Sequence, residues 1–82
     1  VYILESERHG RLYIGASDDV ERRVEEHNQG QTKSTSTGRP WKLLYKHLCE
    51  DRITALRLER TLKSWKNSTR VRAWIERNKD GM

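Results

Sequence analysis

Hydrophobic and polar positions along this chain alternate between the period of a β-strand and that of an α-helix. Two short apolar runs near the start, residues 1–5 and 11–15, are rich in β-branched and aromatic residues and flank a polar segment. This pattern predicts a β-hairpin. Pairing the runs so that Tyr2 lies opposite Tyr13 matches apolar residues with apolar ones. We therefore expect both tyrosines side by side on one face of a sheet.

A helical period follows this hairpin. Val20, Val24 and His27 recur at spacings of four and three residues, which places them on one face of a helix. Asp18, with Glu21 three residues later, has the pattern of a capping box. Together these signals predict a helix from Asp18 to His27.

The second half of the chain predicts one more strand and two more helices. Residues 43–48, which follow Trp41, are the predicted third strand. Thr54 is placed to cap a helix with an apolar stripe. Ser68 is the predicted start of a last helix. The expected fold class is α+β, a three-stranded antiparallel sheet flanked by helices in the order β-β-α-β-α-α. Residues 1–82 are expected to form a single domain, since so short a chain supports only one core.

Composition excludes several classes of protein. The longest uninterrupted apolar run is Val1–Leu4, far shorter than a membrane span or the core of a signal peptide. Cys49 is the only cysteine, so no internal disulfide is possible and a reducing cytoplasmic location is expected. No phosphate loop or dinucleotide fingerprint is present, which argues against an organic cofactor.

The positive charge is concentrated in the second part of the chain. The formal net charge is +5, but residues 1–30 hold 4 basic and 7 acidic side chains, whereas residues 31–82 hold 13 and 5. No acid interrupts residues 31–49, and Glu59 is the single acid within residues 57–72. Such a surface favours a polyanionic partner, because neutralised phosphates release counterions. The alternative is a solvated basic face that serves solubility.

A few polar residues fall where the pattern expects apolar ones. Arg23 and His27 are four residues apart and project toward the side of their helix that meets the sheet. Glu59 lies on the flank of a buried stripe, and a carboxylate there needs a partner. An ion pair with Lys63, one helical turn further on, is the simplest explanation for it. Taken singly, each of these residues also has an ordinary structural explanation.

The chain combines Val1-Tyr2-Ile3 and Leu12-Tyr13-Ile14-Gly15 with Arg23, His27 and Glu59 further on. This combination resembles the GIY-YIG nuclease domain, and the resemblance covers nearly the whole chain. Residues 33–45 also resemble the connecting segment of stand-alone bacterial members and of structure-specific nucleases. The first half-motif keeps the tyrosine and has Val1 where the family pattern has isoleucine.

This resemblance implies a metal-dependent endonuclease that cleaves DNA, with structure rather than base sequence as its target and a place in DNA repair. Tyr2, Tyr13 and Arg23 would line the scissile phosphate, and Glu59 would hold one divalent ion, Mg²⁺ or Mn²⁺. The family pattern favours Tyr13 as the base, and whether His27 relays a proton stays open. The cations expected to bind nucleic acid are Lys33, Arg39, Lys42, Lys46 and Lys63.

Two other functions are compatible with the sequence. The first is a nucleic-acid-binding module of the same fold that does not cut, in which Glu59 only pairs with Lys63. The second is a protein-interaction adaptor that uses exposed tryptophans. Trp41, Trp65 and Trp74 have spacings that indicate burial, so the adaptor is the weaker alternative.

Overall fold

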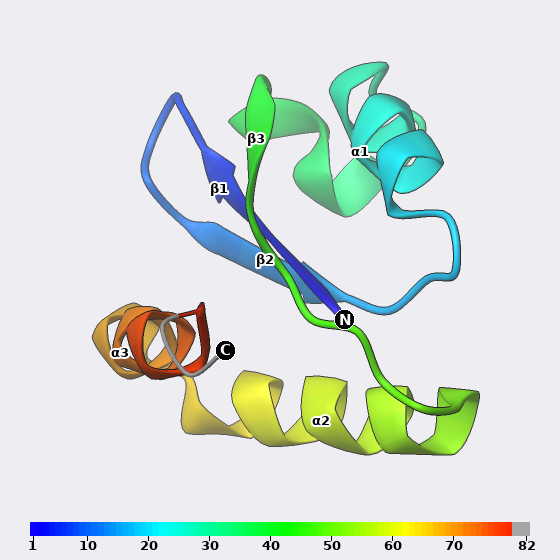
Figure 1. Ribbon diagram of the computed structural model, residues 1–82. Coiled ribbons are helices and arrows are strands. Elements are labelled where there is room, and N and C mark those ends of the chain that lie inside the picture. Colours follow the sequence, from blue (N-terminus) through cyan, green and yellow to red (C-terminus); the bar gives the residue numbers. More distant parts are fainter. Residues whose placement is uncertain (80–82) are drawn as a thin grey trace.

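The computed structural model describes residues 1–79 and confirms the predicted fold class. An antiparallel sheet in the order β2-β1-β3 separates two layers of helices (Figure 1). Helix α1 and the short 3₁₀ helix η1 lie on one face of the sheet, and helices α2 and α3 lie on the other. The elements are β1 (Tyr2–Ser6), β2 (Leu12–Gly15), α1 (Val20–Asn28), η1 (Lys33–Gly38), β3 (Trp41–Lys46), α2 (Arg52–Trp65) and α3 (Ser68–Lys79).

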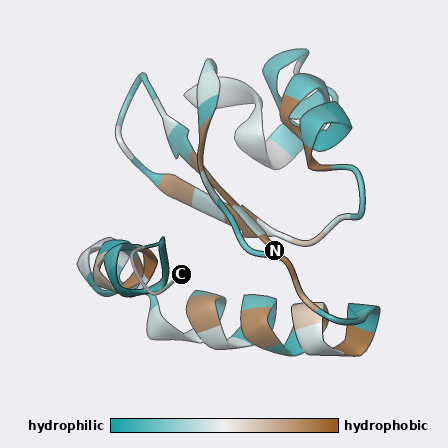
Figure 2. Cartoon of the chain, in the orientation of Figure 1, coloured by the Kyte–Doolittle hydropathy of each residue, from teal (hydrophilic) through white to brown (hydrophobic). Residues whose placement is uncertain are grey.

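The central strand β1 is buried on both faces, which explains the uninterrupted apolar run at the start of the chain. Ile3 and Leu4 both have an exposed fraction of 0%. Ile3 packs toward α2 and α3, and Leu4 toward α1. Figure 2 shows hydrophobic residues concentrated in the strands and along α2, while α1 is mostly hydrophilic. Within the described residues, no helix is long and apolar enough to cross a membrane.

The register of the β1–β2 hairpin differs from the prediction by two residues. Tyr2 lies opposite Gly15, and Tyr13 lies opposite Leu4. Because side chains alternate with a period of two, this shift keeps both tyrosines on the face that α1 covers. The tyrosines are therefore diagonal neighbours, with ring centroids 6.2 Å apart, and not direct cross-strand partners.

The side chain of Ser6 explains the different register. Its hydroxyl accepts hydrogen bonds from the backbone N–H groups of Arg8 and His9, at 3.1 and 3.2 Å. The carbonyl of Ser6 accepts a bond from Gly10, which has a φ of +75°. This hydroxyl-capped turn lies one residue further along the chain than the turn that strand pairing alone predicts.

Aspartates begin both helices whose starts were mispredicted. Asp19, and not Asp18, caps α1 by accepting a hydrogen bond from the backbone N–H three residues on. Asp51 caps α2 in the same way, by accepting a hydrogen bond from the backbone N–H of Thr54, at 2.7 Å. Asp and Thr are both good caps, so composition alone does not decide between them. The predicted start of α3 at Ser68 is confirmed.

Strand β3 begins and ends two residues earlier than predicted, and a bulge at Leu44 interrupts its pairing with β1. The bulge reverses the alternation of side chains in the rest of the strand. Lys42 therefore lies on the side of α3, with its Nζ 3.2 Å from a carboxylate oxygen of Glu5. Lys46 lies on the opposite side, where its Nζ is 3.1 Å from Glu21 of α1.

Candidate active site

Two tyrosines from adjacent strands form the floor of the candidate site. Tyr2 is 1% exposed, and Tyr13 is half-buried beside it on the edge strand β2. Gly15 lies opposite Tyr2, and a Cβ atom at this position would come within 2.6 Å of the Cζ and hydroxyl oxygen of Tyr2. The glycine is therefore required because the phenol ring occupies the space of a side chain.

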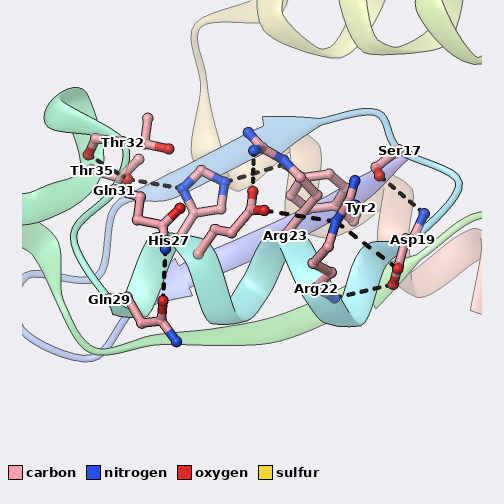
Figure 3. A network of polar contacts seen from close by, with 11 residues as sticks. Tyr2, Ser17, Asp19, Arg22, Arg23, His27, Gln29, Gln31, Thr32 and Thr35 are labelled. Carbon is pink, nitrogen blue, oxygen red and sulfur yellow. Dashed lines mark hydrogen bonds and ion pairs between the residues drawn. The ribbon is translucent and has the colours of Figure 1, made fainter.

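His27, in the last turn of α1, joins Tyr2 to the η1 segment (Figure 3). The ring is 0% exposed, with Nε2 3.2 Å from the Tyr2 hydroxyl and Nδ1 2.8 Å from the hydroxyl of Thr35. The Thr35 hydroxyl donates its only proton to the carbonyl of Thr32, at 3.2 Å. We therefore assign the proton of His27 to Nδ1, so that Nε2 accepts the hydrogen bond from Tyr2.

Burial and a nearby charge keep the hydrogen-bonded pair of His27 and Tyr2 uncharged. Burial lowers the pKa of His27, and the nearby positive charge of Arg23 lowers it further. Burial also raises the pKa of the Tyr2 hydroxyl, although the adjacent Arg23 acts in the opposite direction. Both shifts favour an uncharged imidazole and a protonated phenol near neutral pH. Tyr2 is thus a hydrogen-bond donor to His27 in the resting site.

Arg23 projects from α1 beside Tyr2 (Figure 3). Its Nη1 is 2.5 Å from a carboxylate oxygen of Glu26, and its side chain is 31% exposed. The neighbouring Tyr2 hydroxyl and then Glu26 raise the pKa of Arg23, so it stays positively charged. Glu26 engages one nitrogen of a guanidinium that has five N–H donors. The remaining donors allow Arg23 to bind an oxyanion at the same time.

Glu59 and Lys63 approach the tyrosines from the other layer. They project from α2 along the free edge of β2, and the Nζ of Lys63 lies 5.9 Å from the centroid of the Tyr13 ring. The same Nζ is 2.7 Å from Oε2 of Glu59, the i,i+4 ion pair that the sequence offered as an alternative. The hydrogen bond to Glu59 raises the pKa of Lys63, and burial opposes this shift.

The five predicted catalytic residues do not all lie on the same face of the sheet. Tyr2, Tyr13, Arg23 and His27 gather on the α1 face of the sheet. Glu59 reaches this group through Lys63, and its negative charge contributes to the raised pKa of Tyr2. The β2 edge is the place where groups from both layers come together.

Glu59 is the one predicted metal ligand, and a divalent ion there would need an accessible carboxylate oxygen. Residues 1–79 contain no cluster of three or more His, Cys, Asp or Glu side chains that could hold a metal. The ion pair with Lys63 is made through Oε2 of Glu59, and the Glu59 side chain is 20% exposed, so its carboxylate is partly accessible to solvent. A single, partly accessible carboxylate fits a hard cation that keeps most of its waters and also binds substrate phosphate.

The structure separates the cations that were predicted to bind nucleic acid. Lys33 and Arg39 are exposed at the two ends of η1, and Lys63 belongs to the site. Lys42 and Lys46 are paired with acids from distant parts of the chain. Residues 31–49 contain no acid, but the fold brings acidic side chains from other segments next to two of their lysines. The binding roles of all five cations stay predictions.

Sequence reasoning missed three residues that support the site. Thr35 fixes the proton on His27, but its position in a run of serines and threonines resembles an ordinary linker. The Asn28 side chain bonds both backbone groups of Trp41, at 2.5 and 2.9 Å, and joins α1 to β3 without any sequence signal. Glu26 had a signal, since it follows Arg23 by three residues.

The chain is similar to a known protein family and to several bacterial proteins. Residues 1–72 match the model of the family described as the GIY-YIG catalytic domain. The UPF0213 proteins of Staphylococcus aureus strains Mu3, Mu50 and COL are each 39% identical to this chain over 69 residues. These matches cover 83% of this chain and 84% of each relative. No solved structure matches the chain significantly.

Proposed function

Because the chain belongs to the family of the GIY-YIG catalytic domain, we propose that it is a metal-dependent endonuclease that hydrolyses phosphodiester bonds in DNA. Membership of this family implies nuclease-type activity. The observation that carries the finer proposal is the arrangement beside the two tyrosines. Arg23 lies beside Tyr2, Lys63 lies near the ring of Tyr13, and the side chain of Glu59 is 20% exposed.

In this proposal, Arg23 and Lys63 bind the scissile phosphate. Both side chains are partly exposed and positively charged, and they come from opposite layers of the fold. The planar guanidinium of Arg23 suits two phosphate oxygens, whereas the ammonium of Lys63 acts as a point charge. Together they would offset the charge that develops on the phosphoryl oxygens during hydrolysis.

The two tyrosines take different roles in this proposal. The Tyr2 proton is directed at His27, so Tyr2 positions groups by its hydrogen bond and is not free to take a proton. Tyr13 is more exposed, and we propose that it accepts the proton of the attacking water. The charge of Lys63, 5.9 Å from the Tyr13 ring, would stabilise the phenolate formed in that transfer.

Glu59 is the residue that would hold Mg²⁺ or Mn²⁺. A bound ion would polarise the phosphoryl oxygen and stabilise the leaving oxygen. We further propose that DNA structure, and not base sequence, determines where the enzyme cuts. The exposed cations Lys33 and Arg39 have long side chains suited to phosphate contacts, which carry no sequence information.

Glu59→Gln tests this function. The substitution keeps size and hydrogen bonding but removes the charge that binds the ion, so cleavage of branched, single-stranded and duplex DNA in Mg²⁺ or Mn²⁺ should fall at least about a hundredfold. Stability should change by only about 0.3–0.5 kcal/mol, the value of an i,i+4 ion pair. Lys63→Met is the matched variant, because it breaks the same pair and keeps the carboxylate. It should lose only about tenfold in rate, equivalent to one charge-assisted hydrogen bond.

The second candidate is the binding module that does not cut DNA. The 2.7 Å pair between Glu59 and Lys63 favours it, because the pair gives the carboxylate a purely structural partner. In that case the wild-type protein would bind DNA but cut none of these substrates, and both variants would lose only the same small stability. A Glu59→Gln protein that cuts DNA at the wild-type rate would rule out the metal-dependent mechanism.

A further inference from the structure

An open groove of about 610 Å³ adjoins the candidate site on the outer side of β2. One wall consists of the hairpin turn and β2, including Arg11 and Tyr13. The other wall consists of the end of α2 and the start of α3, including Lys63 and Lys66. Figure 1 shows how the fold brings these distant segments together, with α2 and α3 beneath the sheet. Because Tyr13 and Lys63 belong to both, the groove and the site form one continuous surface.

The charge of this groove differs from that of the other large groove in the described structure. Arg11, Lys63 and Lys66 line the groove beside β2, and Lys63 is paired with Glu59. Among residues 1–79, no acidic residue lines this groove. The other groove, of about 720 Å³, is lined by three carboxylates, including Asp18 and Asp51, together with two cations. A polyanion is therefore attracted to the first groove and disfavoured in the second.

Arg11 and Lys66 are available to bind a ligand. Both are exposed, and within residues 1–79 no carboxylate oxygen lies within 4.0 Å of either charged group. Lys66 also stands where glycine is favoured, since it ends α2 in the left-handed conformation with φ 49° and ψ 37°. A lysine in that conformation is strained, whereas glycine would not be.

We propose that this groove holds one strand of the DNA as it leaves the site, with Arg11 and Lys66 binding successive phosphates. The inference rests on the proposed function, because it takes the scissile phosphate to lie beside Tyr13 and Lys63. It adds a binding surface that is separate from η1 and β3. The contacts are to the backbone of the strand, so the groove accepts any base sequence.

Paired charge-neutralising variants test the groove. We would compare Arg11→Gln/Lys66→Gln with Arg52→Gln/Arg77→Gln, which removes the same two charges from exposed positions outside the groove. Binding of a fluorescent single-stranded oligonucleotide is measured by anisotropy in EDTA across a KCl series, so that no cleavage intervenes. The groove variant should flatten the plot of log affinity against log salt by about 1.4, or about 0.7 for each lost phosphate contact. The control pair should keep the wild-type slope.

Lys66→Gly separates a binding role from a structural one. Glycine relieves the left-handed strain, so the melting temperature should stay the same or rise while DNA affinity falls. If the melting temperature falls and affinity is unchanged, Lys66 has only a structural role and the inference is wrong. Equal changes of slope in the two double variants would also overturn it, because net charge alone would then explain binding.

The outcome for the groove is distinguishable from the outcome for the proposed function. If Glu59→Gln abolishes cleavage but the groove variant binds like the wild type, the function stands and the strand takes another path. If the wild-type protein cuts no DNA but the groove variant shows the flattened salt slope and the control pair does not, the groove stands and the catalytic proposal fails.

Discussion

Tyr2 is positioned by a residue that has no side chain. A Cβ at position 15 would overlap the Tyr2 ring, so Gly15→Ala should displace the hydroxyl and weaken its bond to His27. We expect a loss of about 1–3 kcal/mol in the free energy of unfolding, the usual cost of overpacking, together with slower cleavage. Urea denaturation and the NMR shifts of the His27 ring nitrogens provide the measurements.

Gly10→Ala is the control for this prediction. Its Cβ would meet nothing within 4 Å, but its φ of +75° makes alanine unfavourable. This variant should therefore lose stability through its backbone alone and keep the wild-type shifts of the His27 ring. If Gly15→Ala also keeps those shifts, Gly15 does not position Tyr2.

His27 should make stability depend on pH. Burial holds its folded pKa below the unfolded value of about 6.5, so the unfolded chain binds more protons in this range. The associated stability is present above about pH 6.5 and is lost as pH falls through the folded pKa. The melting temperature should therefore decrease between pH 7.5 and pH 5. In His27→Gln, which does not titrate, this decrease should be smaller, and an identical decrease in both proteins would exclude His27 as its source.

At the level of elements, the bulge in β3 determines where two cations point. Without it, Lys42 and Lys46 would lie on the same face of the sheet, since they are four residues apart. The bulge places them on opposite faces, each beside a carboxylate. The exposed cations of η1 have no such partner within 4.0 Å in residues 1–79, because neither Lys33 nor Arg39 takes part in an ion pair there.

This difference predicts unequal contributions to DNA binding. Lys33→Gln/Arg39→Gln should flatten the salt dependence in duplex DNA by up to about 1.8, because two phosphate contacts are lost. Lys42→Gln/Lys46→Gln should flatten it by less than half as much, because Glu5 and Glu21 already neutralise these cations. Anisotropy titrations of both double variants across a salt series make the comparison. A larger effect of the β3 pair would show that DNA displaces the carboxylates.

At the scale of the whole molecule, folding joins the acidic first part of the chain to the basic second part. Glu5 of β1 lies 2.5 Å from Nη2 of Arg72 on α3 and 3.2 Å from Nζ of Lys42 on β3. Arg72 and then Lys42 hold the pKa of Glu5 below its usual range. One carboxylate thus connects the central strand, an edge strand and the last helix.

Glu5→Gln should accordingly lower the melting temperature at neutral pH. A depressed pKa means that the stabilisation is present above the unfolded value of about 4.5 and is lost as pH falls through the folded pKa. The melting temperatures of the wild type and the variant should therefore converge between pH 5 and pH 3. Glu7→Gln serves as the control, because Glu7 is exposed and makes no ion pair within the described residues. A constant difference across this range would mean that charge is not the cause.

Local patterns were sufficient for the type and order of the elements. Alternation and helical spacing depend only on neighbours along the chain, so the hairpin, three helices and the face of the two tyrosines could be predicted. The face survived an error of two residues in register because side chains alternate with a period of two. The resemblance likewise rested on residue types at fixed spacings, from Tyr2 to Glu59.

Choices between equivalent partners depended on the tertiary structure. Asp18 and Asp19 are equally good caps in composition, and only the path of the chain into α1 selects the second. The hydrogen bond from His27 to Thr35 and the ion pair of Lys46 with Glu21 join residues 8 and 25 positions apart. Such contacts are set by packing of the sheet against its helices, which no local period encodes. The same packing determines the protonation of His27 and which cations stay free to bind DNA.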